Sequence, residues 1–386
     1  MLYVDTERVV IKSWCNNPEE EAINQAKNLA NLPFIFKQVC LMPDTHSGYG
    51  MPIGGVIATH KVVIPNAVGV DIGCGMCAVR TSLTEIPLDD LKLILGEIRK
   101  NIPVGFAHHT ESQELKGLGA IPDSPVIQSE LNAAKKQLGT LGGGNHFIEI
   151  QKGDDGYIWV MLHSGSRNFG LKIAKHYNKI AQQLCAKWYS AIPTFKGDDG
   201  LAFLPIDTTE GKEYIDSMNY ALLFARENRL HMINRIKDII LSVSNCTFGD
   251  IIDIHHNYAQ MENHFGANVM VHRKGATSAR LSQIGIIPGS QGTSSYIVEG
   301  LGKEDSFQSC SHGAGRAMSR TKAQETLRLE DEVGRLDKRG ILHAIRGKKD
   351  LDEASGAYKD IDLVMSEQSD LVKVLVKLEP LAVIKG

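Results

Sequence analysis

The chain has 386 residues, a length that fits two or three domains of ordinary size or one large domain. Hydrophobic residues make up 42% and charged residues 23%, proportions typical of a folded globular protein, which excludes a disordered or collagen-like chain. The formal net charge of -3 excludes overall basicity as a basis for binding nucleic acid or an anionic membrane, so nucleic-acid binding would need a local cationic patch.

Cysteine usage and hydropathy indicate a protein of a reducing compartment. Seven cysteines, an odd number at low density, are scattered over the chain, unlike the dense and even sets of disulfide-stabilised secreted domains. Residues 1–15 contain no uninterrupted apolar run of the kind found in signal peptides, and no window of the chain approaches about 20 apolar residues. We therefore expect a cytoplasmic protein with no membrane segment.

Hydrophobic periodicity predicts four amphipathic helices. The first has Asn17 as its N-cap and Pro18 at its first helical position, and it extends to residue 29. The other three cover residues 91–98, 172–188 and 214–244. Short runs rich in β-branched and aromatic residues predict strands at residues 55–58, 157–161, 250–254, 268–271 and 296–298.

The order of these elements indicates the fold class. Helices and strands are mixed without a regular alternation, which argues against a barrel or a doubly wound sheet. No P-loop motif, Rossmann glycine motif or G-x-S-x-G elbow occurs. We predict an α+β fold in which residues 1–386 form a single large domain of mixed sheets and helices around a central cleft. Residues 108–125 and 190–212, rich in small and polar residues, are predicted to be variable surface loops.

Histidines beside small residues are the most unusual feature of the sequence. Six of them lie where the backbone can turn sharply and leave a side chain facing a cavity: His46, His146, His163, His255, His256 and His312. Any one alone is readily explained as a hydrogen-bonded structural residue. Together with a cysteine and an aspartate they form a mixed sulfur, nitrogen and oxygen set. That set suits zinc, manganese(II), cobalt or iron(II) better than calcium or magnesium, so we expect metal in the central cleft.

Cys74 and Cys77 form a C-x-x-C sequence. A structural zinc site would bring a second close pair of cysteines or histidines, and the chain has no second C-x-x-C. The flanking residues also lack the strand-to-helix pattern of a thioredoxin-like motif. We therefore interpret Cys74 as a ligand candidate and Cys77 as a packed thiol.

Small residues at positions 309–316 lead into a helical pattern at residues 317–322. A helix that begins there would gather backbone N-H groups at a point suited to phosphate. His312, Arg316 and Arg320 would share one face of that helix, where a histidine could attack a phosphoryl group and arginines could neutralise its oxygens. The alternative is a glycine-rich turn followed by a solvated basic helix face.

These residues are similar to the motifs of a known family. The chain resembles the RtcB-type RNA ligases, also called tRNA-splicing ligases, from residue 33 to residue 386. The similarity rests on motifs that occur in the family's order: GVDIGCG at 69–75, LGGGNHFIE at 141–149, HSGSR at 163–167, HN at 256–257, IPGS at 287–290, SHGAGR at 311–316 and AYKDID at 357–362.

The resemblance implies a GTP- and manganese(II)-dependent ligase that joins RNA 2′,3′-cyclic phosphate or 3′-phosphate ends to 5′-hydroxyl ends, in RNA repair or tRNA splicing. It implies that His312 takes GMP from GTP as a covalent intermediate. Cys74 would bridge two manganese ions, one also held by Asp71 and His146 and the other by His163 and His256. The family motif places this last ligand directly before Asn257, which is why His256 is preferred to His255.

The resemblance also assigns binding roles. Guanine and ribose contacts would fall on Glu149, Ser290, Ser295, Tyr358 and Lys385, and phosphate contacts on Asn145, Asn257, Ala314, Gly315 and Arg316. We expect Arg167, Arg316 and Arg320 to grip RNA phosphates. The expected partners are RNA with broken ends and an archease-type activator, and the expected oligomeric state is a monomer.

Two other functions remain open from the residues. A metal-dependent phosphoesterase without a covalent nucleotidyl intermediate would use the same cysteine, histidine and aspartate cluster. It would leave His312 and its glycine-rich neighbours unexplained. An RNA-end-binding protein with a structural metal is the non-enzymatic alternative.

Overall fold

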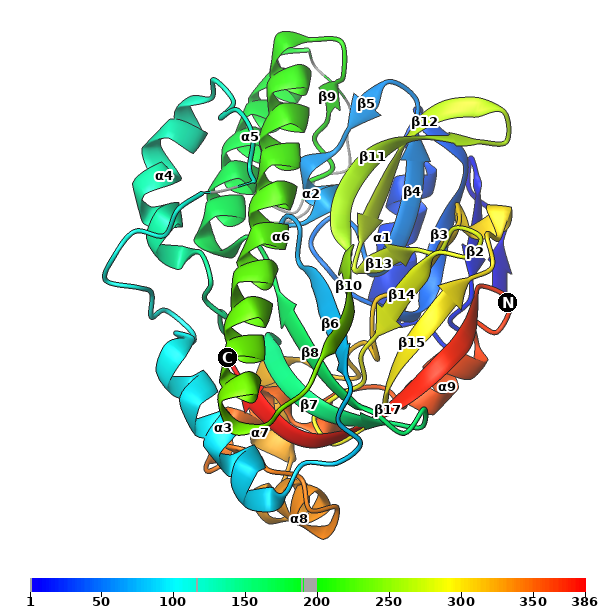
Figure 1. The fold of residues 1–386 in the computed structure, drawn as a ribbon. Helices are drawn as coiled ribbons and strands as arrows, with labels where there is room; N and C mark the ends of the chain where they lie inside the picture. Colours follow the sequence, from blue (N-terminus) through cyan, green and yellow to red (C-terminus); the bar gives the residue numbers. More distant parts are fainter. Residues whose placement is uncertain (1, 116, 189, 191–199) are drawn as a thin grey trace.

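The computed structural model describes residues 2–115, 117–188, 190 and 200–386. Two large sheets form its framework (Figure 1). A six-stranded sheet has the order β1 (Leu2–Val4), β2 (Val10–Ser13), β3 (Ile35–His46), β4 (Ile53–Thr59), β12 (Ala267–Lys274) and β11 (Asn257–His264). A seven-stranded sheet has the order β10 (Phe248–His255), β6 (Gly75–Thr81), β8 (Ile158–Ser164), β7 (Phe147–Gly153), β17 (Val372–Lys385), β15 (Ser295–Gly300) and β14 (Ile284–Ile287).

Almost every strand pair is antiparallel, as expected of an α+β fold. The exception among the pairs of the two large sheets is β2 with β3. Two short ribbons complete the strands, β5 (Val62–Val63) with β9 (Leu204–Pro205) and β13 (Ala276–Ser278) with β16 (Ser309–Ser311). The strand β17, which comes after all the others in the chain, lies inside the seven-stranded sheet between β7 and β15.

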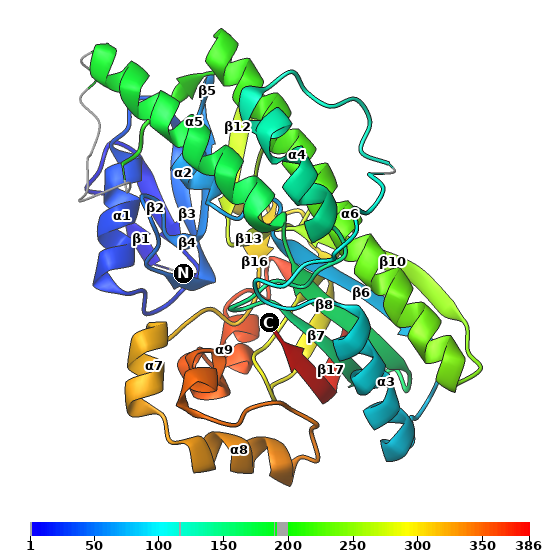
Figure 2. The same cartoon turned by 90° about the vertical axis from the view of Figure 1, so that its left-hand side faces the viewer.

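Helices cover the sheets on several sides. They are α1 (Glu20–Ala30), α2 (Pro65–Val68), α3 (Leu88–Asn101), α4 (Pro125–Gln137), α5 (Arg167–Lys187), α6 (Thr209–Val243), α7 (Arg320–Thr326), α8 (Leu329–Lys338) and α9 (Ile361–Ser366). Short 3-10 turns lie at Glu304–Ser306, Lys348–Glu353 and Ser355–Ala357. Figure 2 shows α7, α8 and α9 grouped on one side of the molecule, away from α4, α5 and α6. None of the helices in the described ranges has the length and hydropathy needed to cross a bilayer.

The apolar stripes of α3 and α6 bury one face of the seven-stranded sheet. Leu91, Ile94 and Ile98 recur at helical spacing on α3, and they pack with residues of α6 and of β6, β7 and β8 in one buried cluster. A second cluster joins β3, β4 and β12 to β14 and β15, so the two sheets pack against each other at that point. The pocket described below opens beside this junction.

The predicted fold class is confirmed, and the four predicted helices and five predicted strands are all present. Their ends differ by a few residues. The first helix begins at Glu20 after Glu19 as its N-cap, not after Asn17. The fourth begins at Thr209, because the Thr208 side chain accepts a hydrogen bond from the Gly211 N-H and caps it.

The two predicted loops have different outcomes. Residues 108–115 and 117–124 contain no helix or strand, in agreement with the prediction, and α4 begins at Pro125. Within 190–212, the prediction of an unstructured loop is wrong at residues 204–205, which form β9, and from residue 209, which begins α6. Residues 191–199 of this segment lie outside the described residues.

The helix predicted over residues 317–322 begins later in the structure than predicted. The helix α7 begins at Arg320, with Ser319 as its N-cap. The preceding residues cannot be helical because their backbone groups pair with another segment: Ala317 N donates to Ala357 O at 2.9 Å and Lys359 N donates to Gly315 O at 2.9 Å. His312, Arg316 and Arg320 therefore share no helix face, and the phosphate site expected at a helix N-terminus is absent at His312.

Candidate active site

The loops at one end of β6, β7 and β8 bring a cysteine and two histidines together. Cys74 directly precedes β6, His146 directly precedes β7, and His163 lies near the end of β8. Because Met76 and Phe147 both pair with His163 in the sheet register, these three segments meet at the same edge. The Cys74 Sγ atom lies 3.2 Å from His163 Nε2 and 3.4 Å from His146 Nε2.

Two further side chains complete this cluster. Asp71 Oδ2 lies 3.2 Å from His146 Nε2. His256, in the connection from β10 to β11, places its Nε2 3.3 Å from His163 Nε2. Potential ligand atoms therefore form two overlapping triads, Asp71 with Cys74 and His146, and Cys74 with His163 and His256, each with all its atoms within 4.8 Å of one another. Cys74 belongs to both triads.

The chemistry of this cluster fits divalent cations. Burial, together with the neighbouring histidines, holds the pKa of His163 and of His256 well below the ordinary value, so both rings are neutral and able to act as ligands. Asp71 Oδ1 and the Nδ1 atoms of His146 and His256 are buried without a hydrogen-bond partner among the described residues. A shared thiolate with imidazoles and a carboxylate on either side suits a pair of borderline transition-metal ions.

The neighbours His255 and Cys77 lie outside the cluster. Burial, followed by the nearby Arg229, lowers the pKa of His255 to about 4. Its Nδ1 atom accepts a hydrogen bond from the Arg229 guanidinium at 3.1 Å, so the ring belongs to a buried ion-pair network with Asp253. Cys77 has no exposed surface and packs in the cluster beneath α3 and α6, as expected of a packed thiol. Burial raises the pKa of this thiol to about 12.

His312 lies next to the cluster and is held by a buried carboxylate. The His312 and His256 ring centroids are 4.7 Å apart. His312 Nδ1 lies 2.6 Å from Asp44 Oδ2, and the His312 backbone N-H donates to the same oxygen at 3.1 Å. Asp44 comes from β3 of the other large sheet and has no exposed surface. Since Nδ1 is engaged, Nε2 is the ring nitrogen available for chemistry.

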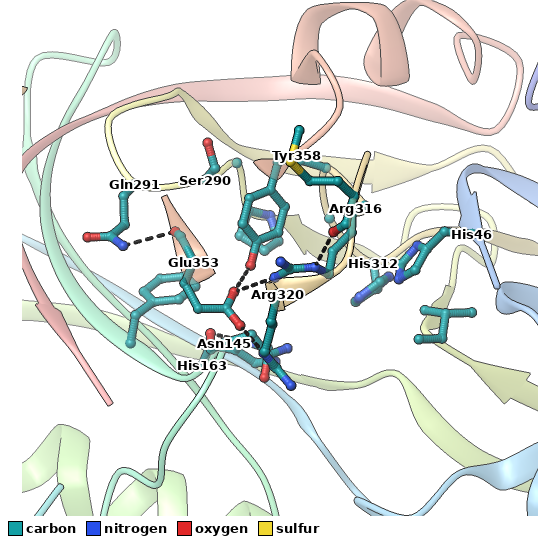
Figure 3. Close-up of a pocket in the computed structure, with 18 of the residues that line it drawn as sticks. His46, Asn145, His163, Ser290, Gln291, His312, Arg316, Arg320, Glu353 and Tyr358 are labelled. Carbon is teal, nitrogen blue, oxygen red and sulfur yellow. Dashed lines mark hydrogen bonds and ion pairs between the residues drawn. The ribbon is translucent and has the colours of Figure 1, made fainter. Parts of the chain in front are cut away.

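A cavity of about 450 Å³ opens over His312 and His163 (Figure 3). Its volume is in the range of small-molecule sites. The residues with assigned roles that line it are Asn145, Glu149, His163, Ser290, His312, Ala314, Gly315, Arg316, Arg320, Tyr358 and Lys385. The cavity therefore joins His312 to cationic, hydroxyl and carboxyl side chains drawn from distant parts of the chain.

One wall of the cavity is organised by Glu353, which is 2% exposed. It accepts hydrogen bonds from Arg316 at 3.0 Å, from Arg320 at 2.7 Å, and from the Tyr358 hydroxyl (Figure 3). Burial alone would raise the pKa of Glu353, but Lys385, the Tyr358 hydroxyl and the two arginines outweigh it and hold the pKa below its ordinary value. Glu353 is therefore an ionised carboxylate that orients two cations at the rim.

Glu149, on β7, also lines the cavity. Burial raises the pKa of Glu149 to about 8, against the opposing effects of Lys385 and of Gln151. The Gln151 amide donates to Glu149 Oε2 at 2.7 Å and to Ser295 Oγ at 3.2 Å. Lys385 lines the cavity and is only partly exposed, and the desolvation of its ammonium group lowers its pKa. Glu149 is therefore a carboxyl group whose protonation changes close to neutral pH.

The chain was compared with models of known protein families, and one family model matches it. A family model described as "tRNA-splicing ligase RtcB" matches residues 25–124 and 110–386. The chain belongs to the RtcB family. The predicted resemblance is thereby confirmed.

Individual RtcB proteins match over nearly their whole length. The chain is 41% identical to "RNA-splicing ligase RtcB" of Escherichia coli (strain K12), over 99% of this chain and 98% of the relative. It is 33% identical to "tRNA-splicing ligase RtcB" of Methanococcus maripaludis, over 96% of this chain and 92% of the relative. It is 31% identical to the protein of the same name from Thermococcus kodakarensis, over 95% of this chain and 92% of the relative.

Some residues to which RtcB resemblance assigns contacts lie away from the cavity wall. Ser295 is 1% exposed and lies behind Glu149, joined to it through Gln151. Asn257 donates to Asp71 O at 3.1 Å and accepts from Gly275 N at 2.8 Å, which holds the Asp71 loop in place. Arg167 lies on the far side of the cluster, where it donates to Thr140 Oγ1 at 2.9 Å and Gly105 O at 2.6 Å.

Two residues of this RtcB site received no role from the sequence, Asp44 and Glu353, and His46 was noted there only as one of six candidate histidines. Asp44 and His46 belong to an unusual Pro-Asp-Thr-His run, and His46 lines the cavity while its Nδ1 contacts Asp44 O at 2.9 Å. Nothing near Glu353 in the sequence marks it, since its partners become neighbours only in the folded chain.

Proposed function

We propose that this chain is an RNA ligase that joins a 3′-phosphate or 2′,3′-cyclic phosphate end to a 5′-hydroxyl end, with GTP as the activating nucleotide. The names of its relatives as RNA-splicing and tRNA-splicing ligases support the ligase role. The observation that carries the covalent step is His312, whose Nδ1 is held by Asp44 and whose ring lines a nucleotide-sized cavity.

In the first step His312 Nε2 attacks the α-phosphorus of GTP. The new N-P bond forms as the bond to pyrophosphate breaks, and the ring becomes positively charged. The buried Asp44 carboxylate accepts the Nδ1-H hydrogen bond, which stabilises that charge and fixes the tautomer. In the second step a 3′-phosphate oxygen of the RNA takes the GMP group, the N-P bond breaks, and His312 is regenerated.

In the third step the 5′-hydroxyl oxygen attacks the activated 3′-phosphorus, loses its proton, and GMP leaves. A cyclic phosphate end must first be opened by water. We infer that Asp71, Cys74 and His146 would hold one manganese(II) ion and that Cys74, His163 and His256 would hold a second. Such ions supply charge stabilisation on phosphoryl oxygens and orientation of the reacting groups.

The cavity walls have separate roles in this proposal. Glu149 would accept hydrogen bonds from guanine, and Lys385, Tyr358 and Ser290 would contact the nucleoside. Arg316 and Arg320, oriented by Glu353, would neutralise phosphate oxygens. Arg320 has 54% of its side chain exposed, which leaves it accessible to RNA as well.

A labelling experiment tests the covalent step. The protein is incubated with manganese(II) and GTP labelled at the α-phosphate, and acid-labile label on the protein is measured. Wild type and the control His60→Ala, an exposed histidine on another part of the surface, should both be labelled, and His312→Ala should not. A metal-dependent phosphoesterase or an RNA-end-binding protein would give no adduct in any of the three.

A further inference from the structure

A single arginine of α6 is bonded to several of the segments that carry the histidine cluster. Arg229 has no exposed surface. A guanidinium group has five N-H donors, and here each of them has an acceptor. Two donate to Asp253, and one each donates to Gly73, Ser164 and His255. The side chain is therefore held in one orientation by all of its donors.

Two of these bonds anchor the guanidinium and three extend toward the cluster. Asp253 accepts from Nε at 2.6 Å and from Nη2 at 2.8 Å, a bidentate arrangement that fixes the plane of the group. Nη1 donates to Gly73 O at 2.9 Å and to Ser164 O at 3.0 Å, and Nη2 donates to His255 Nδ1 at 3.1 Å. Burial opposes the charge of Arg229, but Asp253 outweighs it and raises the pKa, so the group is a cation.

The three acceptors on the cluster side share one property. Each is the direct sequence neighbour of a potential metal ligand, and the pairs are Gly73 with Cys74, Ser164 with His163, and His255 with His256. These three ligands make up one of the two triads of the cluster, and the other triad has only Cys74 in common with it. Arg229 is therefore bonded beside every ligand of one ion site and beside one ligand of the other.

The strand register explains how one side chain reaches three segments. Gly75 of β6 pairs with His255 of β10 on one side and with Ser164 of β8 on the other. The helix α6 packs against these three strands (Figure 1). A Cβ atom on Gly75 would lie 3.1 Å from Arg229 Nη1, so a side chain there would crowd the guanidinium. The glycine lets the cation approach all three strands at the edge where the ligands lie.

Asn228, the preceding residue of α6, binds a different part of the cluster. Its amide oxygen accepts from Thr140 N at 3.1 Å, and its amide nitrogen donates to Thr140 O and to Ser164 Oγ, each at 3.1 Å. Thr140 begins the segment that leads to His146. The His146 segment is thus held by Asn228 and not by Arg229, so substitution of Arg229 should act on the two triads unequally.

The energetics of buried ion pairs favour a geometric role for Arg229. Removal of a carboxylate and a guanidinium from water costs about as much as their attraction returns, so apolar replacements often give equal stability. Lysine would keep the charge, but its three donors lie on one nitrogen and cannot reproduce the planar fork of arginine. The feature that this position uses is therefore the fixed direction of the arginine donors.

We propose that Arg229 is a positioning residue that holds Cys74, His163 and His256 together as a ready-made site for one manganese(II) ion. Residues that orient metal ligands commonly change metal affinity by about 10- to 100-fold. The inference rests on the proposed function and adds to it the residue that organises one of the two ion sites. The other site shares only Cys74 with this one and would depend on Arg229 much less.

The test measures metal binding directly. Electron paramagnetic resonance of free manganese(II) gives the number of bound ions and their Kd values for wild type, Arg229→Lys and the control Arg273→Lys. Arg273 also has no exposed surface and pairs with a carboxylate, Glu262, at 2.5 Å. Among the described residues, none of its hydrogen-bond partners adjoins a ligand of the cluster. The urea midpoint and GMP labelling are measured for each protein.

Two deletion backgrounds identify which ion is affected. His256→Ala disables the site that Arg229 is proposed to organise, and His146→Ala disables the other. Arg229→Lys is introduced into each background, and the Kd of the remaining ion is measured in the same way.

A positioning role predicts a selective loss. Wild type and Arg273→Lys should bind two ions with the same Kd values, although Arg273→Lys should have a lower urea midpoint. In Arg229→Lys the Kd of one ion should rise about 10- to 100-fold while the other is retained. The same rise should occur in the His146→Ala background. In the His256→Ala background the change should be less than about 3-fold, because the site concerned is already lost.

Other outcomes overturn the inference. Two normal Kd values in Arg229→Lys, or an equal loss in both deletion backgrounds, would exclude a selective positioning role. If Arg229→Lys does not fold, Asp253→Asn, which removes the anchor and keeps the guanidinium, is measured instead and should show the same selective loss. Failure of both to fold while Arg273→Lys folds would assign the pair to stability alone.

The result for wild type separates this inference from the proposed function. If wild type binds two ions and takes up the GMP label in these cases, only the Arg229 inference fails. If wild type binds no pair of ions and forms no GMP adduct, the proposed function itself fails.

Discussion

Nδ1 of His312 lies 2.6 Å from Oδ2 of Asp44, although 268 residues separate the two in the chain. The carboxylate has no exposed surface and also accepts the His312 backbone N-H. Both the ring and the main chain of His312 are therefore fixed by one side chain of β3. This pair joins the six-stranded sheet to the loop after β16 and engages Nδ1, so Nε2 is the nitrogen that would react in the proposed covalent step.

Asp44→Asn should slow the formation of the GMP adduct about 100-fold or more, because an amide holds the wrong tautomer and cannot balance the charge on the reacting ring. The rate is measured in a single turnover with labelled GTP, and Asp89→Asn, an exposed position on α3, serves as the control. A wild-type rate for Asp44→Asn, with the fold intact by circular dichroism, would rule out the orienting role.

Metal binding can be tested with two cysteine variants, Cys74→Ala for the proposed ligand and Cys77→Ala as its matched control. Added manganese(II) should raise the Tm of wild type, since a ligand present at about 100 times its Kd stabilises by about 2.7 kcal/mol. Cys74→Ala should lose this response and all labelling while it remains folded. Cys77→Ala should keep the response with a slightly lower Tm, because it removes only a packed thiol. A Cys74→Ala protein that unfolds under the same conditions would indicate a structural metal.

The protonation of Glu149 predicts the pH dependence of GTP binding. Its pKa of about 8 means that the carboxyl is mainly neutral at pH 7, whereas guanine N-H groups need the ionised acceptor. Binding must therefore release a proton below pH 8, and the affinity should increase as the pH rises toward 8 and level off above it. Calorimetry in buffers of different ionisation enthalpy should detect release of about one proton at pH 7. Glu149→Gln should bind more weakly and without this dependence.

Glu353→Gln should destabilise the fold by about 3 kcal/mol, since it leaves Arg316 and the other cations of that wall without their buried counter-ion. The measurement is the urea midpoint at constant m-value. Glu325→Gln, an exposed residue of α7, is the control and should change the free energy of unfolding by less than about 0.5 kcal/mol. GTP affinity should fall as well in Glu353→Gln, and equal stability of the two variants would contradict the assigned role.

Local patterns in the sequence predicted most of the elements, because periodicity and turn residues act over a few positions. The α3 stripe of Leu91, Ile94 and Ile98 is an example. The prediction of a helix at residues 317–319 is wrong because of contacts with a segment that is distant in the sequence. Those residues have helix-compatible side chains, but pairing with residues 357–359 takes the backbone groups that a helix would use.

The residues of the site also fall into two groups, those that local sequence motifs identify and those that only the folded structure identifies. Motif residues such as Cys74 and His163 could be named from their surroundings, because glycine-rich turns mark positions where side chains face a cavity. Asp44 and Glu353 could not, since a buried carboxylate is identified only by partners that the fold brings to it.

The place of β17 between β7 and β15 has a consequence for synthesis of the protein. Until residues 372–385 leave the ribosome, the edges of β7 and β15 lack the strand that joins them, and unpaired strand edges invite association with other chains. Lys385 joins the lining of the cavity over His312 only with that strand. A growing chain therefore completes the seven-stranded sheet and the lining of this cavity in the same event, at the end of its synthesis.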